Sequence, residues 1–367
     1  MILFKGPRDQ LLSPLQSVCG IVEKRHTLPI LSNVLMEKDG EKLTLLATDI
    51  EIQITTRTPT IGAEKASMTV GARKLQDILR SLPESAEVSL ALEDKRLQLK
   101  AGKSRFNLQT LPAEDFPRMS AADGQPTRLL VTQKQMKRLL GLVQYAMAQQ
   151  DIRYYLNGLL LVAKGKELRM VATDGHRLAY AAEVLADAPV PIEVILPRKT
   201  VLELSRQLSD SDDPLEITLT PTQARFSFGG IELVSKLIDG KFPDYERVIP
   251  QHHSKLIKLS RNTLLHSLLR AAILTNEKFR GVRLVLGAGS LKIISSNAEQ
   301  EEAQEEIEIE YSGEALDVGF NVTYLLDVLN NVGNETIELH LADANSSALF
   351  VLPGNETFKY VVMPMRI

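Results

Sequence analysis

Stretches of helical and strand-like hydrophobic patterning alternate along the whole chain. Apolar residues spaced three and four positions apart lie on one face of a helix, and this spacing predicts amphipathic helices at 9–22, 72–82, 132–148, 197–208, 260–274 and 322–332. Between the helices lie short stretches in which apolar and polar residues alternate, as at 42–57. This alternation is typical of half-buried strands. Lys38-Asp39-Gly40 precedes that stretch and has the composition of a hairpin turn.

The same order of elements occurs three times. The string LTLLATD begins at Leu43, returns as LRMVATD at Leu168 and recurs more faintly as LKIISSN at Leu291, at intervals of 125 and 123 residues. Two further sets of strings keep this spacing to within a few residues: VGARK at 70–74, ILPRK at 195–199 and VGFNV at 318–322, and the pairs Phe116-Pro117, Phe242-Pro243 and Met363-Pro364. A period this long exceeds the 20–50 residues of solenoid repeats, and each unit is large enough to hold its own core. We therefore expect three copies of one domain, at 1–122, 128–250 and 251–367.

Each unit contains two helices, and its two halves resemble each other weakly. In the first unit, Leu43-Thr44-Leu45 and Leu97-Gln98-Leu99 each follow a turn and lie 54 residues apart. The other segments alternate like antiparallel strands. The predicted fold class is α+β: three tandem domains, each with two helices packed on antiparallel sheets and with an internal pseudo-symmetry.

The composition excludes several classes of protein. The longest apolar runs are far too short to span a bilayer, and the opening MILFKGPRDQ has no apolar core of a secretory signal. A single cysteine, Cys19, excludes a disulfide framework and a cysteine-ligated zinc site. We interpret Cys19 as a small buried hydrophobic residue. We expect a cytoplasmic protein without a cofactor, a metal site or a membrane partner.

The charges are segregated along the chain. The formal net charge of −3 alone argues against a nucleic-acid partner. The segment 95–105, however, carries five basic residues and no acid, whereas 299–310 carries seven glutamates and no base. We expect both segments to include strands, with the alternation clearest at 307–311. Further basic residues gather on predicted helices: Lys134, Lys137, Arg138, Arg73, Lys74, Arg80, Arg198, Lys199 and Arg206.

An early basic strand and a late acidic strand favour head-to-tail contact between chains, which closes into a ring if the rotation allows. A domain of about 120 residues has a diameter of roughly 35 Å, so three domains in a ring leave a hole only about 6 Å wide. Six domains, from two chains, leave a hole on the order of 35 Å, and duplex DNA is roughly 20 Å across. A ring of two chains therefore admits DNA, and basic helices lining the hole would remove the objection from net charge.

Several long strings resemble those of one known family. They are HTLPILSN at 26–33, QQDIRYYLNG at 149–158, ATDGHRLA at 172–179, DGKFPDYERVIP at 239–250, RAAILTNEKFRGVR at 270–283 and YVVMPMRI at 360–367. From end to end the chain resembles the β sliding clamp family, the β subunit of bacterial DNA polymerase III. The resemblance implies a head-to-tail homodimeric ring of six similar domains, with helices inside and sheets outside. It implies a processivity factor, not an enzyme, that encircles duplex DNA without regard to sequence and tethers the replicative polymerase, the clamp loader and other proteins through short peptides.

The resemblance also implies three sets of functional residues. Those expected to face DNA are Arg25, Arg73, Lys74, Arg80, Gln150, Arg153, Tyr154, Tyr155, Arg198 and Lys199. Those expected at the dimer interface are Lys74, Arg96, Lys103, Arg105, Phe106, Leu108, Ile273, Leu274, Glu299, Glu301, Glu302 and Glu305. Those expected in a partner-peptide cleft are Leu156, Thr173, Gly175, His176, Arg177, Leu178, Pro243, Arg247, Val248, Ser347, Val361, Val362, Met363, Pro364, Met365 and Arg366. The third unit has Asn321-Val322 where the others have Arg-Lys, which leaves DNA contact by that helix open.

Some motifs have simpler interpretations. The apolar tail 361–365 is unusual for a chain end and suits an adaptable docking surface rich in methionine, but it could also be only the last core strand. Tyr154 and Tyr155 could be core aromatics instead of a platform for DNA. The acidic run could be a solvated face.

The string TDGHR at 173–177 could indicate acid–base chemistry or a turn whose residues simply pack. Against catalysis, the first unit has Glu51 in place of the histidine, the third has Asn297 in place of the aspartate, and neither a triad nor a nucleotide loop is present. A sequence-specific DNA-binding protein would need a recognition element, and no helix-turn-helix or zinc-finger pattern appears. A repeat scaffold without a DNA role stays open.

Overall fold

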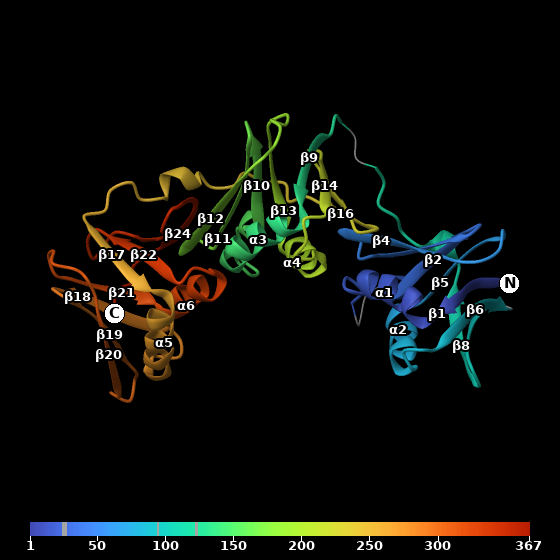
Figure 1. Ribbon diagram of the computed structural model, residues 1–367, viewed down its shortest axis with the longest axis horizontal. Coiled ribbons are helices and arrows are strands. Elements are labelled where there is room, and N and C mark those ends of the chain that lie inside the picture. Colours follow the sequence, from blue (N-terminus) through green and yellow to red (C-terminus); the bar gives the residue numbers. More distant parts are fainter. Residues whose placement is uncertain (24–27, 94, 122–123) are drawn as a thin grey trace. The chain divides into compact units, whose positions relative to one another are not determined.

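The computed structural model describes residues 1–23, 28–93, 95–121 and 124–367, and the same succession of elements occurs three times in it (Figure 1). The first repeat contains β1 (Ile2–Pro7), α1 (Arg8–Cys19), β2 (Asn33–Asp39), β3 (Lys42–Thr48), β4 (Ile52–Pro59), β5 (Lys65–Gly71), α2 (Ala72–Ser81), β6 (Glu87–Glu93), β7 (Arg96–Ala101) and β8 (Ser104–Leu111). The second contains β9 (Thr127–Thr132), α3 (Gln133–Val143), β10 (Gly158–Lys164), β11 (Glu167–Thr173), β12 (Arg177–Val184), β13 (Ile192–Pro197), α4 (Arg198–Gln207), β14 (Pro214–Leu219), β15 (Gln223–Phe228) and β16 (Ile231–Lys236). The third contains β17 (Lys255–Ser260), α5 (Arg261–Ala271), β18 (Gly281–Gly287), β19 (Ser290–Ser296), β20 (Glu302–Glu308), β21 (Leu316–Asn321), α6 (Val322–Asn331), β22 (Thr336–Leu341), β23 (Ala348–Leu352) and β24 (Asn355–Val362).

Each repeat is built from two halves with the order strand, helix and three further strands. The first strand of each half pairs with the second strand of the other half: β1 with β6 and β5 with β2 in the first repeat. The same exchange joins β9 with β14 and β13 with β10, and then β17 with β22 and β21 with β18. The predicted α+β fold with internal pseudo-symmetry is confirmed.

The described residues form two compact units. One comprises Met1–Lys134 and Leu202–Leu237, and its 12-stranded sheet includes an antiparallel pairing of β4 with β16. The other comprises Gln135–Val201 and Ile238–Ile367, and it contains an eight-stranded sheet, in which β12 pairs with β24, and the four-stranded sheet β20-β19-β18-β21. Within each unit, therefore, a sheet continues from one repeat into the next.

Helix α1 shows how the sheet supports a helix that contains a proline. Pro14 has no N–H to donate to the carbonyl of Gln10. The hydroxyl of Thr58, on β4, donates to that carbonyl at 2.8 Å instead, and the hydroxyl of Thr56 donates to the carbonyl of Pro14 at 3.1 Å. The helix therefore continues to Cys19, which is buried as predicted.

All six predicted helices are confirmed, with ends that differ by a few residues. The predicted helix 132–148 ends at Val143 and continues as a 3-10 turn, Gln144–Ala146, and the predicted helix 260–274 likewise ends with the 3-10 turn Ala272–Leu274. No helix among the described residues is long and apolar enough to cross a membrane.

Two predictions about strands were wrong in detail. The acidic strand does not coincide with the alternation at 307–311. It is β20, which begins at Glu302 and ends at Glu308. The basic segment 95–105 is not a single strand but a hairpin of β7 and β8 around Gly102, whose φ of 55° favours glycine. Long-range pairing, which local alternation does not reveal, decides where these strands begin and end.

Candidate functional site

A small apolar cavity of about 180 Å³ lies where the second and third repeats meet within one unit. It is lined by Arg153, Tyr155, Leu156, Thr173, Gly175, Arg177, Leu178, Pro243, Tyr245, Val248, Val361 and Met363. Nine of these residues are among those expected in the cleft. Arg153 and Tyr155 were expected at DNA instead, and Tyr245 was not singled out. The remaining residues of the expected set do not line this cavity: His176, Arg247, Ser347, Val362, Pro364, Met365 and Arg366.

The turn between β11 and β12 forms one wall of the cavity. The carboxylate of Asp174 accepts hydrogen bonds from the backbone N–H groups of His176 at 2.9 Å and Arg177 at 3.1 Å. Asp49 and Asn297, at the matching positions of the other repeats, accept backbone N–H groups two to four residues further on. The most strongly repeated string in the chain is thus a turn motif, in which an aspartate or asparagine side chain satisfies the backbone.

Arg177 is the most constrained side chain at this wall. Its guanidinium is bonded to Asp174 at 3.1 Å, to Asp327 on α6 and to the carbonyl of Tyr145 at 2.7 Å. It also lies 4.5 Å from the centre of the Tyr324 ring. Burial tends to lower the pKa of Arg177, but the Tyr360 hydroxyl and the two carboxylates outweigh burial and raise it. The arginine therefore stays charged inside the wall.

The end of β24 and the residues after it form the part of the wall beside this turn. Val361 and Val362 are buried in the sheet, so for these two residues the interpretation as a core strand holds. Met363 is 42% exposed and lines the cavity, and its N–H donates to the carbonyl of His176 at 2.9 Å. Further along, Met365 donates to the carbonyl of Gly319 at 2.9 Å. The tail thus combines core packing with an exposed methionine at the cavity.

The loop that precedes β10 carries four of the residues expected at DNA. The Asp151 carboxylate accepts hydrogen bonds from the Arg153 side chain at 2.9 Å and from the Arg153 backbone N–H at 2.8 Å. These two bonds lower the pKa of the Asp151 carboxyl to about 2. Tyr154 is 58% exposed, whereas Tyr155 packs partly into the core, so the interpretation as core aromatics applies only to Tyr155. Gln150 is exposed, with a φ of 55°.

The other residues expected at DNA lie mostly on helices. Arg73, Lys74 and Arg80 are exposed on α2, although the Arg73 guanidinium donates to the carbonyl of Val22. Arg198 and Lys199 are half-buried at the start of α4, and burial, together with the charge of Arg177, lowers the pKa of Arg198. Arg25 lies outside the described residues.

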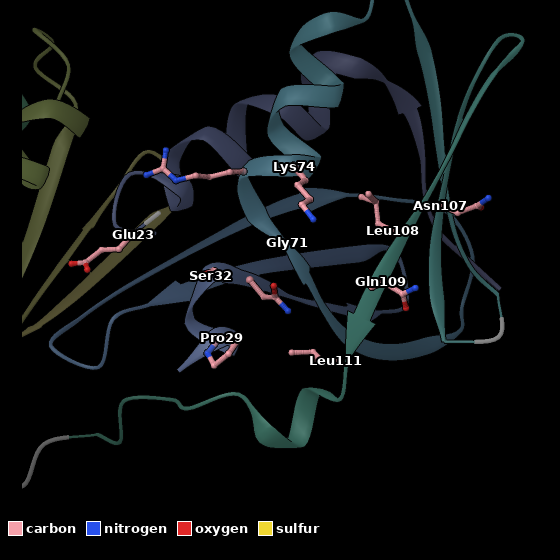
Figure 2. Close-up of a pocket in the computed structure, with 11 residues that line it drawn as sticks. Glu23, Pro29, Ser32, Gly71, Lys74, Asn107, Leu108, Gln109 and Leu111 are labelled. Atoms are coloured by element: carbon pink, nitrogen blue, oxygen red, sulfur yellow. The ribbon is translucent and has the colours of Figure 1, made fainter. Parts of the chain in front are cut away.

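The residues expected at the dimer interface belong to two edges, one in each unit. Phe106 and Leu108 are half-buried on β8. Leu108 and Lys74 line a cavity of about 540 Å³ (Figure 2). On the other edge, Ile273 is 76% exposed and Leu274 is half-buried. The charged members Arg96, Lys103, Arg105, Glu299, Glu301 and Glu302 are exposed. Glu305 is already paired within its own chain, with Arg270.

Three pseudo-symmetric α+β repeats, joined by continuous sheets and carrying a small apolar cleft, define a protein of the DNA-clamp class. Family models of the DNA polymerase III beta subunit match the chain throughout: the N-terminal domain at residues 3–120, the central domain at 130–244 and the C-terminal domain at 246–366. The chain belongs to the DNA polymerase III beta subunit family, the β sliding clamps.

Individual relatives agree with this assignment. The chain is 48% identical to the beta sliding clamp of Pseudomonas aeruginosa over 99% of its length and 100% of the relative. It is 44% identical to the beta sliding clamp of Escherichia coli K12, over 99% and 100% of the two chains. A crystal structure of the DNA polymerase III subunit beta from Pseudomonas aeruginosa superposes with a TM-score of 0.96 over 100% of both chains, at 48% identity.

The protein is accordingly a DNA sliding clamp, a non-catalytic processivity factor. The prediction that it is not an enzyme is confirmed, and TDGHR is a turn. The alternatives of a sequence-specific DNA-binding protein and of a scaffold without a DNA role were wrong.

Proposed function

We propose that two copies of this chain close head to tail into a ring around duplex DNA and hold partner peptides in the apolar cleft. The observation that carries the ring is the way in which the repeats join. Two strand pairings join neighbouring repeats within the chain: β4 of the first repeat pairs with β16 of the second, and β12 of the second pairs with β24 of the third. In each pair, the first strand named ends the first half of its repeat, and the other strand ends the second half of its repeat. The corresponding strands at the two ends of the series are β20, which ends the first half of the third repeat, and β8, which ends the second half of the first repeat. These two strands are left to form a third joint.

Both strands have an edge available. β20 ends the four-stranded sheet, and β8 pairs along its length with β7 but with β5 only at Thr110 and Leu111. A third joint of the same kind between two chains would place β20 of one against β8 of the other. Two such joints close a ring of six repeats, because heterologous contacts close when the rotation returns to the start.

The two sides of this proposed joint carry opposite charges and exposed or half-buried apolar residues. Glu302 and Glu306 are exposed on β20, and Arg96, Lys103 and Arg105 are exposed on the β7–β8 hairpin, so opposite charges would face each other. Ile273 and Leu274 would pack on Phe106 and Leu108, with Lys74, Glu299, Glu301 and Glu305 at the rim. A buried apolar centre with a charged rim is typical of stable interfaces.

Inside the ring, we assign contact with DNA phosphates to basic residues of two helices, to Arg25 and to the loop before β10. The helix residues are Arg73, Lys74 and Arg80 on α2 and Arg198 and Lys199 on α4, and the loop residues are Gln150, Arg153, Tyr154 and Tyr155. Neutralisation of phosphates by lysine and arginine gives affinity without base reading and makes it sensitive to salt. Such contacts let a ring slide, because no sequence traps it.

The cleft is assigned to short peptides of the replicative polymerase, the clamp loader and other DNA-processing proteins. An apolar cavity of about 180 Å³ suits a few side chains of an extended segment rather than a whole domain. Met363 at its edge can repack around different side chains, which supports a site shared by many partners. We further propose domain boundaries at 1–122, 128–250 and 251–367 and a cytoplasmic location.

The ring is tested by cross-linking the proposed joint. In a variant with Leu108→Cys and Ile273→Cys, a bifunctional thiol reagent should yield a closed covalent dimer, while buried Cys19 stays unreacted. If the ring is first loaded onto nicked circular DNA by a clamp loader and then cross-linked, it should remain bound until the DNA is linearised and should then slide off. Retention on linear DNA with free ends, or cross-linking only within single chains, would refute the ring.

The cleft is tested separately. Deletion of residues 363–367 should abolish binding of a fluorescein-labelled peptide that carries a glutamine followed by aliphatic and aromatic residues. The dimer should persist, because the deleted residues bond to β21, which is the edge of the four-stranded sheet opposite to β20. Unchanged peptide affinity after the deletion would overturn the assignment of the cleft.

A further inference from the structure

We propose that Asp327 on α6 is a positioning residue for the peptide cleft and acts through Arg177. The inference rests on the proposed peptide binding and adds a residue that does not line the cavity. The observation is an ion pair between side chains 150 residues apart, which ties the second helix of the third repeat to the cleft turn of the second.

The bonds of Arg177 leave its guanidinium little freedom to bind a peptide. The side chain is 10% exposed and is bonded on three sides, to Asp174, Asp327 and the carbonyl of Tyr145, while the Tyr324 ring covers its face. Asp174 and the Tyr145 carbonyl belong to the same repeat as Arg177. Of the two carboxylates bonded to Arg177, only that of Asp327 therefore belongs to the third repeat.

The wall of the cleft depends on where this arginine lies. Arg177 is the first residue of β12 and pairs with Val362 of β24, next to Met363. Arg177 and Met363 both line the cavity, and the carbonyl of His176 accepts from the Met363 N–H at 2.9 Å. If the carboxylate at 327 were removed, the guanidinium would keep only Asp174 as a carboxylate partner. In a nearly buried place, the loss of one partner of a charged group is costly. We expect it to turn toward the cavity or toward solvent and to reshape the wall.

The equivalent joint in the other unit is held by a different ion pair, between Lys236 at the end of β16 and Glu51 in the turn before β4, at 3.1 Å. Glu203 holds the sixth position of α4, as Asp327 does of α6. Glu203 pairs with Arg206 on its own helix, and β4 begins with Ile52 where β12 begins with Arg177. Both joints thus carry an ion pair across repeats, but Lys236 and Glu51 are each more than half exposed, whereas the Arg177 side chain is 10% exposed. The pair between the second helix and the turn accompanies the joint that carries the cleft.

The experiment measures affinity for the same fluorescein-labelled peptide by anisotropy. Asp327→Asn should weaken binding about tenfold, because it removes the charge but keeps the shape. Asp327→Glu, which keeps the charge on a longer stem, should recover part of the loss. Asp317→Asn is the matched control. Asp317 pairs with Arg283 on the neighbouring strand of the same repeat, and neither residue lines the cavity, so its loss should leave affinity unchanged.

A double-mutant cycle separates positioning from general destabilisation. In an Arg177→Met background, Asp327→Asn should cause no further loss of affinity, since its effect passes through the arginine. An equal loss in both backgrounds, or wild-type affinity of Asp327→Asn, would overturn the inference. Sedimentation and thermal unfolding should show an intact dimer for each variant. If the wild-type protein itself fails to bind the peptide, the proposed cleft is wrong, and that outcome is distinct from both others.

Discussion

Replacement of Ile273 and Leu274 by alanine should convert the dimer into monomers. Ile273 is 76% exposed in the single chain, so its apolar surface contributes little to folding and is available to association. Burial of an isoleucine side chain contributes roughly 1.5–3 kcal/mol. We take about 2 kcal/mol for Ile273 and about 1 kcal/mol for Leu274, which is already half-buried, or about 3 kcal/mol for each joint.

A ring of two chains has two such joints, so the double substitution should cost about 6 kcal/mol of association free energy. At 1.4 kcal/mol for each tenfold change, the dissociation constant should rise roughly 10⁴-fold. Thermal unfolding of the monomer should change little, because the residues that are removed do not belong to the buried core.

Sedimentation velocity over a concentration series from nanomolar to micromolar measures this directly. Leu256→Ala is the control, because Leu256 is also a large aliphatic residue, 52% exposed, in the same repeat but on β17, away from both proposed edges. The control should sediment like the wild type. A double variant that remains dimeric at nanomolar concentration would refute the reasoning about the joint.

Three further predictions follow from individual contacts. Lys199→Ala should weaken DNA binding equally on unrelated sequences and reduce the slope of log affinity against log salt concentration by about one. Filter binding at several salt concentrations measures both effects. A loss of affinity confined to one sequence would contradict the assignment of Lys199 to phosphate contact. Thr58→Val should lower the free energy of unfolding by about 1–3 kcal/mol, because the Gln10 carbonyl loses its donor. The loss should be smaller in a Pro14→Ala background, where a backbone N–H is restored. Equal losses in denaturant titrations of both backgrounds would show that the hydroxyl does not act through that carbonyl. The Asp151 carboxyl should titrate in NMR spectra near pH 2. Its stabilisation of the loop is therefore complete above its ordinary pKa of 3.8 and is lost as the pH falls through about 2. A midpoint near 3.8 would exclude the bond to arginine.

Much of this protein follows from its sequence alone. The six helices are local features, because the spacing of apolar residues determines which face of a helix is buried. The recurring LTLLATD string marks a turn in each repeat, since the aspartate or asparagine bonds to backbone only a few residues away. The long matching strings also led correctly to the family, and most of the residues expected in the cleft line one cavity.

The tertiary structure decided the rest. Alternation predicts a buried face but not a partner strand, so neither the pairing of β4 with β16 nor the true limits of β20 could be read from the pattern. Arg153, which the resemblance assigns to DNA, also lines the cleft, because the loop that carries it folds toward the β11–β12 turn. The bond between Arg177 and Asp327 joins residues 150 positions apart. Such contacts depend on how distant segments pack together, and no local pattern of hydrophobic and polar residues encodes that packing.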